Sequence, residues 1–280
     1  MSDTVADALR RTAERLEAAG CESPRLDAEL LVAHVLGLSR AGLYGESRLA
    51  LSDEERAELE LLVIRRERRE PLAYVLGEWG FRRLTLTVDR RVLAPRPETE
   101  IVVERCLALV SGLDEPRVLD VGTGSGAIAL ALADEHRGAR VTAIDASGDA
   151  LAVARENAER TGLPVELVRW DLFDGLPEGP WDLVVSNPPY VRPGEIESLE
   201  QEVRDWEPRA ALVGEGATEA VARSARGVLR VGGALVLEVA EGSAQEVAAL
   251  LRELGYRDVA VTADLTGRDR VVESVTTSAD

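Results

Sequence analysis

A glycine-rich turn follows a short apolar run near the middle of the chain. The run Val118–Val121 is typical of a buried strand, and a helical pattern over residues 127–133 follows the turn. Glycine lets a backbone turn tightly and approach a ligand closely. Asp145 lies 23 residues after Gly122, at the end of the next apolar run, where its carboxylate could accept hydrogen bonds from both ribose hydroxyls. We therefore predict a site for a nucleoside cofactor, made by Gly122, Thr123, Gly124, Ser125, Gly126 and Asp145.

The same turn leaves the identity of the cofactor open. Gly122, Gly124 and Ala127 also satisfy the dinucleotide fingerprint with alanine in its last place, so the pattern fits NAD as well as S-adenosylmethionine. Asp120, just before the turn, could orient the loop or the amino group of the cofactor, and a purely structural role is equally compatible. A glycine-rich turn that binds nothing would not account for the strand, the helix and the acid together.

A second constellation, Asn187-Pro188-Pro189-Tyr190, follows the apolar run Leu183–Val185. The two prolines cannot continue β pairing, which leaves the Asn187 side chain and the Pro188 carbonyl as a rigid acceptor pair at the sheet edge. Two acceptors that face one point suit an NH2 group whose nitrogen becomes tetrahedral in the transition state. Tyr190 can pack on the substrate or near a cationic methyl group. We predict that Asn187, Pro188 and Tyr190 are catalytic, and that Pro189 joins them in binding the substrate.

The elements that must position these residues belong to an α/β domain over residues 96–280. Apolar runs alternate there with amphipathic helical stretches, which indicates βαβ units and a doubly wound, mostly parallel sheet covered on both faces. The runs are Val118–Val121, Val141–Ile144, Leu183–Val185 and Ala234–Val239. Two further runs, Val259–Val261 and Val271–Val272, could add an antiparallel pair at the edge.

The preceding residues predict two other parts. Residues 1–75 contain apolar stripes at helical spacing and indicate a bundle of three or four short helices. Ser23 can cap one helix ahead of Pro24, and Ser52 with Glu55 forms a capping-box spacing ahead of another. Residues 76–95 contain the alternating run Leu84–Val88, so we predict a β-hairpin linker there.

Charge excludes some partners. The 280 residues are 45% apolar and contain 33 basic residues, all of them arginine, against 51 acidic ones, for a net charge of −18. Residues 96–280 contain 18 arginines and 34 acidic residues, so a net charge of −16 lies on the predicted catalytic domain. Such a surface repels polyanions, and we expect no stable binding of nucleic acid. No apolar run is long enough for a membrane span and no signal peptide is evident, so we expect a cytoplasmic protein without a membrane partner.

Other candidate sites are weaker. His34, His136, Cys21 and Cys106 are too few and too scattered for a metal site, so we predict no metal. The basic run Arg65–Arg69 spreads its charges around several faces of a helix and is interpreted as a solvated helix end.

Taken together, these motifs resemble the bacterial release-factor glutamine methyltransferases, the PrmC/HemK family. The resemblance covers nearly the whole length. Besides the glycine turn and the Asn187–Tyr190 motif, it is carried by Ser23–Glu29, Glu70–Tyr74, Leu93–Glu100 and Asp264–Arg270. One departure is Arg83, because the family usually has a glycine in this hairpin and arginine prefers a negative φ; the resemblance therefore does not fix the geometry of that turn.

The resemblance implies a Rossmann-like class I methyltransferase fold and S-adenosyl-L-methionine as the cofactor. It implies that Asp171 and Leu172 lie by the adenine and that Asn187 also belongs to the cofactor site. The implied substrate is the glutamine of the Gly-Gly-Gln loop in peptide chain release factors, and the product is N5-methylglutamine. It also implies that residues 1–75 recognise the substrate and that residues 96–280 catalyse the transfer.

Two other functions remain as alternatives. An adenine-N6 methyltransferase shares the logic of Asn187–Tyr190, but flipping a base out of a duplex needs cationic phosphate contacts, and a domain of −16 offers few. A non-catalytic protein that senses S-adenosylmethionine or escorts release factors would not need both Asp145 and Asn187.

Overall fold

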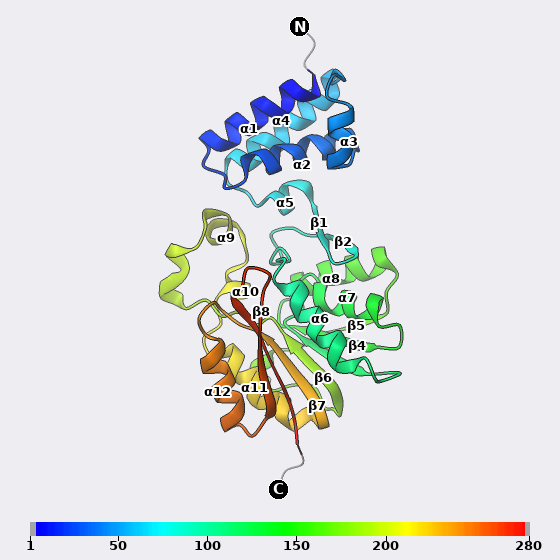
Figure 1. Cartoon of the computed structure of the whole chain (residues 1–280), viewed down its shortest axis with the longest axis vertical. Coiled ribbons are helices and arrows are strands. Elements are labelled where there is room, and N and C mark those ends of the chain that lie inside the picture. Colours follow the sequence, from blue (N-terminus) through cyan, green and yellow to red (C-terminus); the bar gives the residue numbers. More distant parts are fainter. Residues whose placement is uncertain (1–3, 278–280) are drawn as a thin grey trace. The chain divides into compact units, whose positions relative to one another are not determined.

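A computed structural model describes residues 4–277 of the chain, which folds into two compact units (Figure 1). The helical unit contains the chain up to Glu78 together with the short segment Glu200–Trp206. The sheet unit contains Trp79–Leu199 and the chain from Glu207 onward. Residues 200–206 were predicted to belong to the catalytic domain, because nothing in their local pattern indicates a partner elsewhere.

The helical unit packs its helices around an apolar core that includes Val5, Leu16, Leu31 and Val63. Its helices are α1 (Val5–Ala18), α2 (Pro24–Leu36), α3 (Arg40–Gly45), α4 (Asp53–Glu67), α5 (Leu72–Leu76) and α9 (Gln201–Trp206). The predicted capping box is confirmed at α4, where the Ser52 hydroxyl accepts a hydrogen bond from the Glu55 backbone N–H. Ser23 precedes α2 as expected, but its side chain makes no capping bond, so that part of the prediction is wrong.

A two-stranded hairpin follows, with β1 at Glu78–Phe81 and β2 at Leu84–Thr87. All of it except Glu78 belongs to the sheet unit. The residue with a left-handed conformation in this hairpin is Arg82, with φ of 53°, and not Arg83, where the sequence departs from the family. The Arg82 guanidinium holds this conformation by pairing with both carboxylate oxygens of Glu135 at 2.7 Å. An ion pair from a neighbouring helix thus stabilises a conformation that glycine adopts without strain.

The main sheet has seven strands in the order β5-β4-β3-β6-β7-β9-β8, and β9 is antiparallel to both of its neighbours. The strands are β3 (Arg117–Val121), β4 (Arg140–Asp145), β5 (Val165–Arg169), β6 (Trp181–Ser186), β7 (Leu229–Glu238), β8 (Arg257–Ala263) and β9 (Asp269–Val275). The mostly parallel sheet and the antiparallel edge pair are as predicted. Strand β5 was not predicted, because Glu166 interrupts its short apolar run.

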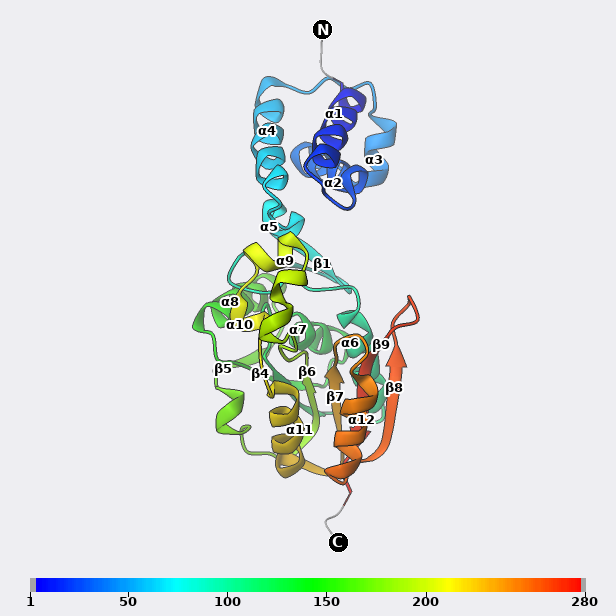
Figure 2. The same cartoon turned by 90° about the vertical axis from the view of Figure 1, so that its left-hand side faces the viewer.

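Helices cover both faces of this sheet (Figure 2). Alternate residues of β3 show why: Val118 belongs to the core under α6 (Thr99–Val110) and α7 (Ala127–Glu135), whereas Leu119 belongs to the core under α11 (Ala217–Val228) and α12 (Ala244–Glu253). Helix α8 (Gly148–Thr161) packs beside β4 and β5. The remaining short helices are η1 (Leu172–Asp174), η2 (Pro193–Ser198) and α10 (Arg209–Leu212). Within residues 4–277, no helix combines the length and the apolar character needed to cross a bilayer.

Candidate active site

The predicted site residues lie at one edge of the sheet. Strands β3 to β7 are parallel, and the register pairs Val121 with both Ile144 and Ser186, so these strands end side by side. The glycine turn, Asp145 and Asn187 follow directly after β3, at the end of β4, and after β6. Because β3 lies between β4 and β6, the chain reverses its strand order here, which is where open α/β sheets bind ligands.

The glycine turn has the backbone conformation that only glycine adopts easily. Gly122 and Gly124 have φ of 75° and 56°, and the Gly122 N–H donates to the Ile144 carbonyl at 2.8 Å. A Cβ atom added to either glycine would meet no atom of the protein within 4 Å. Open space beside a bare backbone fits a ligand that passes close to the chain, as the predicted nucleoside cofactor would.

Asp145 is fixed against this turn by backbone donors. Its Oδ2 accepts from the Gly124 N–H at 2.9 Å, and its Oδ1 accepts from the Ser147 N–H at 2.9 Å. Burial raises the pKa of this carboxyl above its ordinary value. Each carboxylate oxygen can accept a second hydrogen bond, so the side chain keeps the capacity to bind the two ribose hydroxyls.

Asp120 lies beneath the same turn and is fully buried. Its Oδ2 accepts from the Thr123 hydroxyl at 2.6 Å, whereas its Oδ1 has no hydrogen-bond partner among residues 4–277. Burial raises the pKa of Asp120 to about 7. The bond to Thr123 supports a role in orienting the loop, and the unpartnered oxygen leaves one acceptor for a polar ligand.

Asp171 and Leu172 lie after β5, which neighbours β4 at this sheet edge. The Asp171 carboxylate accepts from the Phe173 N–H at 3.0 Å and begins the short helix η1. The structure therefore brings both residues to the edge that carries Asp145.

The Asn187–Tyr190 loop is held on several sides. The Ser186 hydroxyl donates to the Val121 carbonyl at 2.7 Å, which ties the end of β6 to the end of β3. Gly214 packs so closely on Pro189 that an added Cβ would lie 2.4 Å from its ring. None of the hydrogen bonds within the described part of the chain uses the Pro188 carbonyl. The loop is thus rigid, and this acceptor is available for a substrate.

Two polar residues beside the loop, Thr99 and Glu238, were not predicted as site residues from the sequence. Asn187 Nδ2 donates to Thr99 Oγ1 at 3.4 Å, and the Thr99 hydroxyl donates to Glu238 at 2.7 Å. Burial raises the pKa of Glu238 to about 7 and that of Tyr190 to about 12. The sequence feature that could have indicated this arrangement is Glu238, an acidic residue inside the apolar run Ala234–Val239.

The basic run Arg65–Arg69 differs from its interpretation as a solvated helix end. Arg66 is only 5% exposed and donates to Asp27 at 2.8 Å, and both Arg66 and Arg69 pair with Glu202. That interpretation is wrong for these two arginines because α9, more than 130 residues away in sequence, brings a carboxylate to them.

Cys21 and Cys106 are buried free thiols. Within residues 4–277, no cluster of histidine, cysteine and acidic residues could hold a metal ion.

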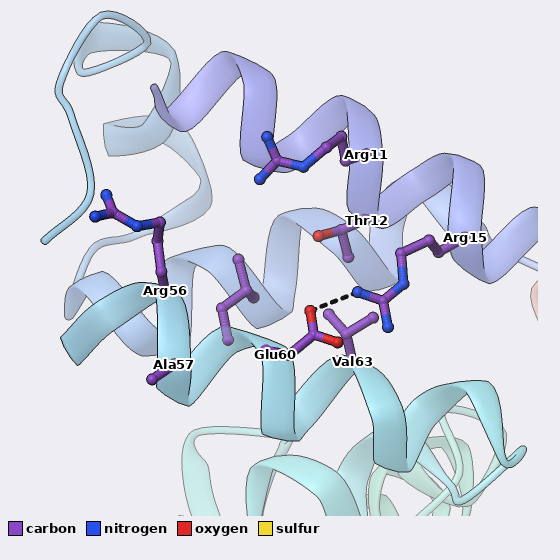
Figure 3. A pocket seen from close by; sticks show the side chains of 8 residues that line it. Arg11, Thr12, Arg15, Arg56, Ala57, Glu60 and Val63 are labelled. Atoms are coloured by element: carbon purple, nitrogen blue, oxygen red, sulfur yellow. Dashed lines mark hydrogen bonds and ion pairs between the residues drawn. The ribbon is translucent and has the colours of Figure 1, made fainter. Parts of the chain in front are cut away.

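A hollow of about 350 Å³ lies between α1 and α4 of the helical unit (Figure 3). None of the predicted site residues lines it. Its central ion pair joins Arg15 and Glu60 at 2.6 Å, and Arg15 also binds Glu67 at 2.8 Å. Because Arg15 and Glu60 on its wall pair with each other and Arg56 pairs with Asp53, we assign no chemistry to it.

Comparisons with known proteins agree with the geometry. Residues 7–77 match the family model described as the PrmC N-terminal domain, and residues 102–264 match the Methyltransferase small domain. The T. thermophilus 16S rRNA N2 G1207 methyltransferase, solved in complex with AdoMet and guanosine, matches with a TM-score of 0.53 and 18% identity, over 71% of this chain and 49% of its own. The fold and the site therefore define a Rossmann-like, S-adenosylmethionine-dependent methyltransferase with an added helical unit.

Relatives of similar length show to which family of methyltransferases the chain belongs. Release factor glutamine methyltransferase from Geobacter sulfurreducens is 41% identical over 96% of this chain and 95% of its own length. The protein of the same name from Cereibacter sphaeroides is 42% identical over 96% of this chain and 98% of its own. The chain belongs to the release factor glutamine methyltransferase family.

Proposed function

We propose that the protein transfers a methyl group from S-adenosyl-L-methionine to the side-chain nitrogen N5 of the glutamine in the Gly-Gly-Gln loop of peptide chain release factors. Membership of the family supports this reaction. The observation that carries the proposal is the rigid acceptor pair of Asn187 and Pro188 beside the glycine turn. Release factors act in translation termination, so we place the protein in the cytoplasm.

The acceptor pair explains how an amide becomes reactive. An amide nitrogen is a poor nucleophile because its lone pair is delocalised into the carbonyl group. Asn187 Oδ1 and the Pro188 carbonyl accept hydrogen bonds from the two N–H groups of the substrate amide. These hydrogen bonds strengthen as the amide nitrogen becomes tetrahedral. Tyr190 stays protonated at neutral pH, since burial raises its pKa to about 12, and its ring packs against the substrate.

The cofactor supplies a methyl group bound to a positively charged sulfur, which is a strong electrophile. The residues that fit it are the turn Gly122–Gly126, Asp145 for the ribose, and Asp171 with Leu172 for the adenine. The methylated amide nitrogen is strongly acidic, so it can lose its proton to water without a dedicated base on the protein. The reaction needs neither a metal ion nor a covalent enzyme intermediate.

The direct experiment is mass spectrometry of the Gly-Gly-Gln peptide of a release factor after incubation with protein and cofactor. We expect one added methyl group on the glutamine. A release factor with glutamate in place of that glutamine is the control, and it should stay unmodified. If the wild-type factor also stays unmodified while the protein binds cofactor, the non-catalytic alternative replaces this proposal.

Asp145→Ala is expected to weaken S-adenosylmethionine binding by ~1.5–3 kcal/mol, because the variant removes a charged acceptor from two hydroxyls. This corresponds to roughly a 10- to 150-fold rise in Kd, measurable by calorimetry. Asp149→Ala is a matched control, because it removes an exposed carboxylate from the first turn of α8. Equal affinities for the wild type and Asp145→Ala, or a preference of the wild type for NAD, would refute the ribose assignment.

Nucleic acid is expected to be neither bound tightly nor methylated at physiological salt, because the net charge of −18 repels phosphates. Label from radioactive cofactor should appear in the release factor and not in purified DNA or RNA. Efficient formation of N6-methyladenine would instead support the adenine alternative, which uses the same Asn187–Tyr190 motif.

A further inference from the structure

Three hydrogen-bonded polar side chains lie next to the acceptor pair. They belong to Glu238 at the end of β7, Thr99 at the start of α6, and Asn187 after β6. The Thr99 hydroxyl donates to Glu238 Oε2 at 2.7 Å, and Asn187 Nδ2 donates to Thr99 Oγ1 at 3.4 Å. Glu238 is 2% exposed and Thr99 is 5% exposed, so water does not compete for these bonds.

The direction of these hydrogen bonds follows from what each group can do. An ionised carboxylate only accepts, so the hydroxyl proton of Thr99 points to Glu238. The lone pairs of Thr99 Oγ1 then face Asn187 and accept from its NH2 group. A carboxamide has a donor side and an acceptor side, so fixing Nδ2 toward the protein interior turns Oδ1 the other way.

We propose that Glu238, acting through Thr99, is a positioning residue that fixes the flip of the Asn187 carboxamide so that Oδ1 faces the substrate amide. The inference rests on the proposed function, because it supplies the geometry that the acceptor pair needs. We call this series of hydrogen bonds from Glu238 through Thr99 to Asn187 the relay. Without it, the Asn187 carboxamide could rotate and present its NH2 group to the NH2 group of the substrate, and two donors that face each other repel.

The surroundings of Glu238 favour this role over simple packing. An apolar side chain would continue the run Ala234–Val239, whereas a buried carboxylate carries a desolvation penalty. The positive charge of Arg270 on β9 and the Asn187 side chain, which also interacts with the carboxylate directly, offset part of that penalty. The negative charge of Glu98, beside α6, adds to it. Tyr190 is a further titratable neighbour, and the negative charge of Glu238 contributes to its raised pKa.

The relay also predicts a pH dependence. Burial raises the pKa of Glu238 to about 7, so this carboxyl changes its protonation state near neutral pH. Once protonated, Glu238 can itself donate, and the Thr99 hydroxyl is no longer held in one direction. We therefore expect kcat to rise as the pH increases through about 7, where Glu238 becomes ionised and acts only as an acceptor.

A matched pair of Thr99 variants tests the relay. Thr99→Val keeps the shape but removes the hydroxyl, and we expect kcat to fall roughly 10- to 100-fold, a typical loss for an orienting partner. Thr99→Ser keeps the hydroxyl and should retain most of the activity. Glu238→Gln should lower kcat similarly and remove the pH dependence near 7, with the cofactor Kd unchanged in all three variants. Equal losses in Thr99→Val and Thr99→Ser would show a packing role and overturn the proposal.

A second readout does not need activity. In the nuclear magnetic resonance spectrum of the full chain, the side-chain NH2 signal of Asn187 is identified by its loss in Asn187→Ala. It should shift with pH around 7 in the wild type, shift less in Thr99→Val, and not shift in Glu238→Gln. A pH-independent signal in the wild type would refute the relay. If the signal shifts with pH but the wild type leaves release factors unmodified, the relay stands and the proposed function is wrong.

Discussion

Replacing Asn187 with alanine is expected to lower kcat by roughly 10²–10³-fold, the usual loss when one transition-state hydrogen-bond partner is removed. The Asn187 Oδ1 binds the substrate amide more strongly as its nitrogen becomes tetrahedral, so the loss falls on the chemical step. Cofactor affinity should change far less, because the glycine turn and Asp145 are unaltered. Single-turnover rates with saturating cofactor measure the effect directly.

Asn187→Gln is the matched variant, because it keeps the carboxamide but moves it by one methylene. If placement matters, this variant should be nearly as slow as Asn187→Ala, since Pro189 and the Ser186 hydroxyl hold the loop in one position. Single-turnover rates within a few-fold of the wild type for Asn187→Ala would contradict the catalytic role.

Deleting residues 1–75 is expected to leave cofactor binding nearly intact and to lower kcat/KM on an intact release factor by roughly 10²-fold or more, equivalent to ~3 kcal/mol of lost binding. A specific protein interface buries roughly 1,200–2,000 Å², and a glutamine loop alone supplies little of that area. The helical unit has its own core and contains none of the predicted catalytic residues, so we propose that it selects the substrate. Steady-state kinetics test this, with circular dichroism and cofactor titration as the controls for folding.

The full chain with Glu202→Gln separates two explanations of such a loss. The deletion also removes Arg66 and Arg69, which pair with Glu202 of α9, and α9 begins eleven residues after Tyr190. If Glu202→Gln alone reproduces the loss, the helical unit acts by holding the α9 segment and not by contacting the substrate. A folded deletion variant as efficient as the full chain would contradict both explanations.

The local patterns of the sequence determined much of the fold and part of the candidate site. The alternation of apolar runs with amphipathic stretches predicted a mostly parallel sheet, because strand and helix periodicities depend on neighbours a few residues apart. The glycine turn and the Asn187–Tyr190 motif were also predictable from local sequence. Left-handed φ values favour glycine and a proline ring ends β pairing, and both are properties of single residues. Since both motifs follow predicted strands, their meeting at one sheet edge was also foreseeable.

Tertiary structure alone decided the features that join distant parts of the chain. Thr99 and Glu238 are 139 residues apart, and Arg69 and Glu202 are 133 apart, so no local pattern indicates either contact. The same reason explains why the strain lies at Arg82, whose conformation depends on Glu135 of α7. Spacing identifies which groups can carry chemistry, but their ionisation and orientation depend on burial and on hydrogen-bond partners that only packing brings together.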